Sequence, residues 1–83
     1  MRFRAKIEVI LKPGHSDPEG DTTTRALREL NYPIKGVSVS KVYTAILEAD
    51  SKANAESMVD EMCQRLLANP TKDDYKFEIW EVK

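Results

Sequence analysis

Residues 3–11 alternate between apolar and mostly charged side chains, and this alternation restricts the fold more than any other feature of the sequence. One face of an extended chain here is entirely apolar, with Phe3, Ala5, Ile7, Val9 and Leu11. The other face is mainly charged, with Arg4, Lys6, Glu8 and Ile10. A period of two is typical of a strand with one buried face, so the chain is expected to begin with a half-buried strand. Lys12-Pro13-Gly14 ends it, because proline lacks a backbone donor and glycine permits a turn.

Two segments have the periodicity and the end signals of helices. The first is predicted to begin at Asp17-Pro18 and to end at Asn31, before Pro33. Its apolar stripe consists of Thr23, Ala26, Leu27 and Leu30. The second is predicted to begin at Asp50-Ser51 and to end at Asn69-Pro70. Its buried stripe is expected at Ala55, Met58, Val59, Met62, Cys63 and Leu66.

The remaining apolar segments predict further strands. Residues 36–49 have the pattern of two strands with a tight connection near Ser40-Lys41, and residues 75–82 have the pattern of a last strand. The element order is then βαββαβ, within one α+β domain of residues 1–83. The simplest arrangement is ferredoxin-like, a four-stranded antiparallel sheet with two helices packed on one face.

The sheet face away from the helices has no covering element in this prediction. It would expose five apolar side chains, including the only tryptophan, namely Ile10, Val42, Ile46, Trp80 and Val82. Several apolar groups on one face indicate a contact surface, and tryptophan is a favoured anchor at interfaces. A chain of 83 residues also has a thin core of its own. We therefore expect self-association, as a homodimer or a dimer of dimers.

Charge and cysteine content argue against several classes of protein. The formal net charge is −1, with acidic and basic residues interspersed, which disfavours binding to nucleic acid or to an anionic membrane surface. No apolar stretch is long enough to span a bilayer, and no signal-peptide core follows the N-terminus. The single cysteine, Cys63, cannot form an internal disulfide, so a cytoplasmic protein is expected.

The residues show no catalytic, metal-binding or cofactor-binding set. His15 is the only histidine, and its loop neighbours Ser16 and Asp17 cannot adopt the geometry of a hydrolase triad around it. Cys63 lies on an apolar helix stripe and is expected to be a buried packing residue. The sequence contains neither of the two glycine-rich patterns that bind phosphate groups, Gly-x-x-x-x-Gly-Lys and Gly-x-Gly-x-x-Gly. These observations favour a small α+β domain with a binding or structural role.

Two segments resemble the signatures of the PurS family. The first runs from Leu11 to Gly20, with the sequence LKPGHSDPEG, and the second runs from Met62 to Pro70, with the sequence MCQRLLANP. Between them, Lys41 and residues 47–50 fit the family's middle strand and the start of its second helix. Asn31 stands where glycine is usual, and both residues tolerate a positive φ. The resemblance covers essentially the whole chain.

The resemblance implies the role of a small subunit of phosphoribosylformylglycinamidine synthase, or FGAM synthase. That ligase of purine biosynthesis converts formylglycinamide ribonucleotide, ATP and glutamine into formylglycinamidine ribonucleotide, ADP, phosphate and glutamate. A glutaminase subunit, PurQ, releases ammonia, and a large synthetase subunit, PurL, carries ATP and magnesium and performs the amidation. The small subunit would hold neither active site nor cofactor. It would assemble the complex, with a further role in ammonia transfer also implied.

Six signature residues are the candidates for contact with the other subunits. They interrupt regular structure with polar or turn-forming groups, and they are Asp17, Pro18, Glu19, Gly20, Asn69 and Pro70. Asp17 and Asn69 also have expected structural roles, as a helix cap and a helix end.

Two other functions fit the predicted fold. A ligand-binding regulatory domain of ferredoxin-like fold would bind a small molecule such as an amino acid between two copies, near residues 12–20. An acylphosphatase-like enzyme would need an arginine in the loop after the first strand, where this chain has Lys12 and His15.

Overall fold

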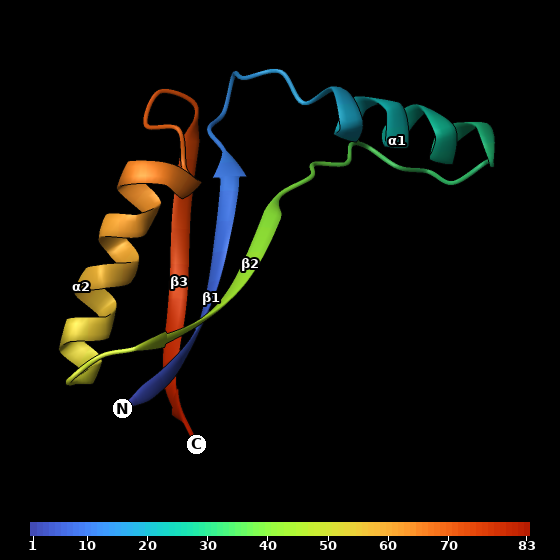
Figure 1. Ribbon diagram of the computed structural model, residues 1–83. Coiled ribbons are helices and arrows are strands. Elements are labelled where there is room, and N and C mark those ends of the chain that lie inside the picture. The colour runs from blue at the N-terminus through green and yellow to red at the C-terminus, as the bar shows by residue number, and fades with distance from the viewer.

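A three-stranded antiparallel sheet forms the centre of the molecule in the computed structural model, which describes residues 1–83 (Figure 1). Strand β1 (Arg2–Leu11) lies in the middle, flanked by β2 (Lys41–Glu48) and β3 (Asp73–Val82). The strands predicted at residues 3–11 and 75–82 are therefore confirmed, and the last begins two residues earlier than expected.

The pairing register gathers the apolar positions of the three strands on one face. Ile7 lies opposite Tyr43 of β2 and Phe77 of β3. Because side chains alternate with a period of two, Phe3 and Val9 share the face of Ile7, and all three are buried. We call this the inner face. The alternation in the first strand thus predicted the buried side of the sheet correctly.

Helix α2 (Lys52–Met62) covers the inner face over β1 and β3. It begins after Ser51, whose hydroxyl accepts a hydrogen bond of 3.0 Å from the backbone N–H of Asn54, which confirms one of the two predicted caps. Cys63 is fully buried, as predicted, and burial raises the pKa of its thiol. The core contains nine residues, Phe3, Ala5, Ile7, Val9, Ala55, Val59, Cys63, Ala68 and Ile79.

The second helix ends in a π-helical turn that its apolar periodicity did not predict. This turn spans Cys63–Leu67, and the N–H of Ala68 donates to the carbonyl of Cys63 at 2.9 Å. A π turn contains more residues than an α turn, so the side chains that follow rotate away from the α-helical stripe. Leu66 is therefore 83% exposed, against the prediction, and Ala68 is buried instead. Met58, also predicted to be buried, lies at the edge of the stripe and is exposed.

The predicted four-stranded sheet is wrong, because residues 36–40 form no strand. Their backbone donors bond to side chains at the first helix instead of to a neighbouring strand. The N–H of Val37 donates to Thr24 Oγ1 at 2.8 Å, and the N–H of Val39 donates to Asp17 Oδ2 at 2.9 Å. With these donors satisfied, the segment follows the helix rather than the sheet.

The predicted pair of helices on one face is also wrong, because α1 (Pro18–Glu29) projects away from the sheet (Figure 1). The guanidinium group of Arg28 donates to the carbonyls of Ile34 and Lys35, at 2.9 and 2.8 Å. These bonds hold the returning segment along the helix. We call residues 17–40 the arm.

The predicted ends of the first helix are confirmed. Asp17 is its cap and Pro18 occupies the first turn. Beyond the last turn, Asn31 has a φ of 70°, the left-handed conformation expected of a residue that ends a helix.

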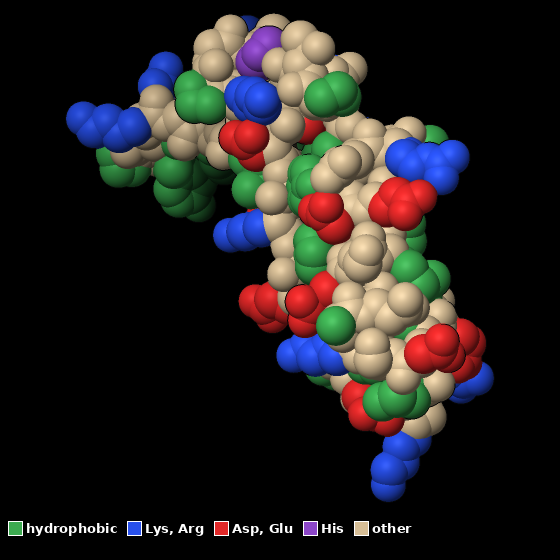
Figure 2. All heavy atoms as spheres, turned by 90° about the vertical axis from the view of Figure 1, so that its left-hand side faces the viewer, with side chains coloured by type: hydrophobic (Ala, Val, Ile, Leu, Met, Phe, Trp, Pro, Cys, Tyr) green, Lys and Arg blue, Asp and Glu red, His purple; other side chains and the backbone are tan.

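Side chains of opposite charge are interspersed on the side of the molecule where α2 lies (Figure 2). Hydrophobic groups are visible between them, and neither sign of charge forms a continuous patch in this view. No helix in the structure combines the length and apolar character that crossing a membrane requires.

Candidate functional site

The two signature segments lie side by side at one end of the sheet. The connection from β1 to α1 and the turn that leads into β3 are joined there by a backbone hydrogen bond. In this bond the N–H of Lys12 donates to the carbonyl of Lys72 at 2.7 Å. The start of β2 lies beside them. We call this region, residues 11–20, 39–41 and 69–74, the loop end.

A cleft of about 300 Å³ opens at the loop end, between the base of the arm and the sheet. Its walls combine lysines and carboxylates from all three segments, including Asp17, Glu19, Lys41, Lys72 and Asp73. Groups of this kind suit ion pairs and hydrogen bonds with another polar surface. No group of three or more histidine, cysteine, aspartate or glutamate side chains is placed to hold a metal ion.

Asp17 joins α1 to the segment that returns from it. Its Oδ1 accepts a hydrogen bond from the N–H of Gly20 at 3.0 Å, and its Oδ2 accepts one from the N–H of Val39 at 2.9 Å. Both bonds favour the ionised carboxylate, so they hold the pKa of Asp17 below its usual value. This signature residue is therefore a structural brace as well as the predicted cap.

We expect acid to loosen the base of the arm. Because the folded-state pKa of Asp17 is lowered, its carboxylate adds stability above the unfolded-state pKa of about 3.9. That stability is lost as the pH falls through the folded-state pKa. The amide NMR signals of Gly20 and Val39 should report one titration with a midpoint below the unfolded-state value. Asp17→Asn should abolish it, and a midpoint at or above that value would contradict the assignment.

Gly20 is buried where the arm folds back on itself. A Cβ atom at this position would overlap the carbonyl oxygen of Val37 and lie 2.5 Å from Asp17 Oδ2. Close packing therefore explains why a glycine stands in the first signature. Glu19, between these two structural positions, is exposed at the edge of the cleft and remains available for contact.

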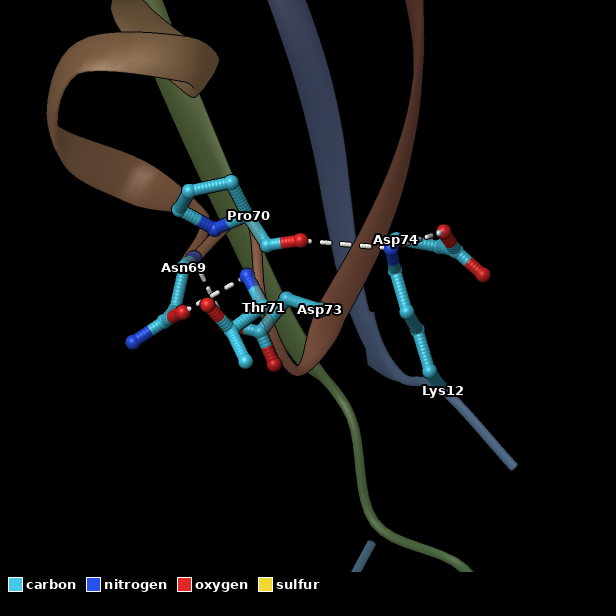
Figure 3. Close-up of polar contacts among 6 residues, drawn as sticks. All are labelled: Lys12, Asn69, Pro70, Thr71, Asp73 and Asp74. Atoms are coloured by element: carbon cyan, nitrogen blue, oxygen red, sulfur yellow. Dashed lines mark hydrogen bonds and ion pairs between the residues drawn. The ribbon is translucent and has the colours of Figure 1, made fainter. Parts of the chain in front are cut away.

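Asn69 organises the turn that leads into β3 (Figure 3). Its Oδ1 accepts a hydrogen bond from the N–H of Thr71, and its own N–H donates to Asp73 Oδ2, both at 2.9 Å. The carbonyl of Pro70 accepts a hydrogen bond of 3.2 Å from the ammonium group of Lys12, which belongs to the first signature. The second signature therefore shapes this turn and is tied to the first.

The model of the family described as PurS, phosphoribosylformylglycinamidine (FGAM) synthase, matches residues 4–81. The chain belongs to the PurS family. A PurS subunit of phosphoribosylformylglycinamidine synthase from Archaeoglobus fulgidus is 43% identical over 77 residues, which are 92% of this chain and 95% of the relative. These findings confirm the family resemblance of the two signatures.

Solved PurS structures confirm the α+β fold. Thermus thermophilus PurS matches with a TM-score of 0.88 and 32% identity, and the match covers 100% of both chains. A chain of the PurLQS structure from Thermotoga maritima matches with a TM-score of 0.87 and 31% identity, covering 96% of this chain and 99% of that chain. None of these comparisons supports the regulatory-domain or acylphosphatase alternatives.

The five residues predicted for self-association lie on the outer face of the PurS sheet, which no element of this chain covers. Val42, Ile46 and Trp80 are exposed, whereas Ile10 and Val82 are half-buried. Ile46 and Trp80 both pair with Arg4 of the central strand. The apolar residues of β2 and β3 therefore flank a row of charges on β1, which runs along the middle of this face.

Sequence reasoning missed two residues that fix the arm of this PurS chain. Thr24 and Arg28 follow Gly20 at intervals of four, so these three positions form one row on α1. The row faces the returning segment, through the hydrogen bonds to Val37, Ile34 and Lys35 described above. Their four-residue spacing was the only signal in the sequence, and this spacing does not show which segment of the chain the row contacts.

Proposed function

We propose that this chain acts, as a single domain, in the role of the small subunit of FGAM synthase, and that it supplies a docking surface rather than an active site. The convergence of both PurS signatures on the loop end carries the proposal. Hydrogen bonds hold most signature residues there in place. Glu19, Lys41 and Lys72 line the cleft on this fixed framework. A rigid polar surface is suited to specific assembly because little entropy is lost when it binds.

The proposed partners are the large synthetase subunit, PurL, and the glutaminase subunit, PurQ. The relative from Thermotoga maritima belongs to a structure named PurLQS, which supports this choice. ATP, magnesium and glutamine bind the partners in this proposal, and the small subunit holds them so that ammonia passes between their sites without loss to water. The cytoplasm is the proposed compartment, because Cys63 is free and a reducing environment keeps thiols in this state.

Reconstitution of the three subunits tests this function. The purified chain alone is expected to turn over neither glutamine nor ATP, and its addition to PurL and PurQ should produce glutamine-dependent amidation. Ammonia supplied in place of glutamine is the control, because it should make amidation independent of this chain. ATP or glutamine turnover by the isolated chain, or no gain when it is added, would refute the proposal.

Reversal of the charge of Glu19 should weaken assembly without unfolding the chain. We expect Glu19→Lys to reduce affinity for the PurL–PurQ pair about fivefold, the size of a surface ion-pair effect. Asp21→Lys is the matched control, because Asp21 also lies in the first turn of α1 but does not line the cleft. If calorimetry gives equal affinities for Glu19→Lys and the wild type, Glu19 makes no essential contact in the interface.

We further propose self-association through the outer face, with Trp80 as its anchor. Trp80 is 39% exposed, and burial of that remaining surface is worth about 2 kcal/mol. Trp80→Ala should therefore lower the association state, as measured by light scattering at tens of micromolar, and leave the circular dichroism spectrum unchanged. Leu66→Ala is the control, because Leu66 is exposed on the π turn. A monomeric wild type, or an unchanged oligomer in Trp80→Ala, would contradict this interface.

A further inference from the structure

The cleft at the loop end lies on the inner side of the sheet, where the strands meet the base of the arm. Lys41 pairs with Val9 of the central strand, and Asp73 pairs with Leu11. Residues that are directly opposite in a sheet point to the same face, so these four side chains belong to the inner face. Lys41 therefore borders the cleft on the β2 side, and Lys72, next to Asp73, borders it on the β3 side.

Two of the three carboxylates that line this cleft already accept hydrogen bonds from the chain itself. Asp17 uses both of its oxygens, on backbone N–H groups of the arm. Asp73 Oδ2 accepts a hydrogen bond of 2.9 Å from the N–H of Asn69. The third carboxylate, Glu19, is exposed on the arm. The acidic side of the cleft therefore serves mainly to hold its own framework.

Both lysines of the cleft, in contrast, have no partner within the chain. The ammonium groups of Lys41 and Lys72 make no hydrogen bond and no ion pair, and both residues are exposed. The third lysine of the loop end, Lys12, donates to the carbonyl of Pro70 and lies 3.9 Å from Asp74 (Figure 3). Four clefts open on the molecule, and only this one is lined by two cationic side chains that lack an intrachain partner.

Two ammonium groups in one cleft suit an anionic group that accepts hydrogen bonds from both. A lysine side chain has three donors and no acceptor, and its bonds to carboxylates are stronger than bonds to neutral groups. The cleft also has an apolar lining, made of Val9, Leu11 and Val39. A glutamate side chain matches both features, because its methylene groups contact apolar surface while its carboxylate reaches the lysines.

We propose that this cleft binds an acidic segment of the PurL–PurQ pair, with one carboxylate held between Lys41 and Lys72. The inference rests on the proposed function and assigns the chemistry of the partner surface that meets the loop end. Glu19 lies on the arm side of the cleft, so a basic group beside the carboxylate of the partner completes the match. Such pairing of opposite charges fixes the register of two surfaces as well as strengthening their contact.

The charge of the cleft favours a carboxylate on a partner over a free anion from solution. Three acidic and two basic side chains line the cleft, so its net charge is −1. A small anion would therefore gain no long-range attraction toward the lysines. A carboxylate on a partner surface is brought to the cleft by the rest of the interface, so short-range bonds to the two lysines are sufficient.

Zero-length cross-linking with a carbodiimide tests the contact in the unmodified complex. This reagent activates a carboxylate, which then forms an amide with a lysine amine in direct contact. We expect mass spectrometry of the reconstituted complex to show Lys41 or Lys72 joined to an aspartate or glutamate of PurL or PurQ. The absence of such products, or cross-links of these lysines only to a second copy of this chain, would overturn the proposal.

Removal of the two charges gives a second readout. We expect the double variant Lys41→Gln, Lys72→Gln to bind the PurL–PurQ pair about tenfold more weakly, because each exposed ion pair contributes roughly threefold. The affinity of the wild type should fall as salt is added, and that of the double variant should fall less, because salt screens the charges that it lacks. Lys83→Gln, at the opposite end of the sheet, should match the wild type (Figure 1).

The outcomes separate this inference from the proposed function. If the wild type binds the PurL–PurQ pair and the folded double variant binds equally well at every salt concentration, the acidic contact is wrong and the proposed function stands. If the wild type does not bind the pair, the proposed function fails and the inference fails with it. Free glutamate titrated into the isolated chain should give no binding heat, and binding that the double variant lacks would assign the cleft to a small ligand instead.

Discussion

Phe3→Ala is expected to lower the melting temperature by about 20 °C. Phe3 is 1% exposed and is among the largest side chains of a nine-residue core. Truncation of a buried phenylalanine costs about 3–5 kcal/mol, which is a large part of the stability of a small domain. Each kcal/mol corresponds to about 4–8 °C in a domain of this size.

Leu66→Ala is the control for this truncation, because it also shortens an apolar side chain, at a position outside both the core and the outer face. Leu66 is exposed, so its replacement should change the free energy of unfolding by less than about 0.5 kcal/mol. Thermal melts followed by circular dichroism, at one protein concentration, provide the comparison. A fall of less than 5 °C for Phe3→Ala would show that the core does not control stability as the burial indicates.

Gly20→Ala is expected to disrupt the arm, although alanine is the better helix former. Alanine in a helix gains up to about 1 kcal/mol relative to glycine. Here its Cβ would overlap the Val37 carbonyl, a backbone atom that cannot move without loss of the bonds at Thr24 and Asp17. Overpacking of this kind costs about 1–3 kcal/mol, so the steric effect exceeds the helix gain.

Hydrogen exchange of the Val37 and Val39 amides measures the damage, because both donate to side chains at α1 in the wild type. Their protection should fall in Gly20→Ala, while the amides of β1 stay protected. Gly36→Ala is the matched control, since no atom beyond the two flanking residues lies within 4 Å of a Cβ at that position. Equal protection in both variants would show that the arm tolerates a side chain at Gly20.

Features encoded by short-range chemistry were predictable from the sequence. The cap at Asp17, the cap at Ser51 and the left-handed Asn31 depend on neighbouring residues, and all three are found. The inner face of β1 was predictable because burial selects one phase of an alternating strand. The approximate extents of β1 and β3 follow from the same pattern.

The position of α1 was not predictable in this way. Its stripe shows that one side of the helix requires a cover, but the same stripe fits a helix on its own sheet or on another chain. Residues 36–40 alternate like a strand, yet their donors bond to Thr24 and Asp17. The π turn depends on how the end of α2 meets the core, so the helical period placed Leu66 wrongly.

The candidate site shows a similar division. The PurS signatures indicated that the loop end has a function, but they did not distinguish residues that hold its structure from residues available to contact a partner. Hydrogen bonds assign Asp17 and Asn69 to the framework, and steric packing does the same for Gly20. Glu19 differs from them only in its exposure at the cleft, which no sequence pattern records.

The order of the strands has a consequence for how the chain folds during synthesis. β1 is made first and lies in the middle of the sheet, yet β3, one of its two partners, comes last, and Arg2 pairs with Val82. A ribosome must therefore release residues 73–82 before one edge of the central strand can be covered. Until then, that edge offers unpaired backbone groups to any passing strand. The fold is thus completed only after residues 73–82 have been made, when the first and last strands of this domain pair with each other.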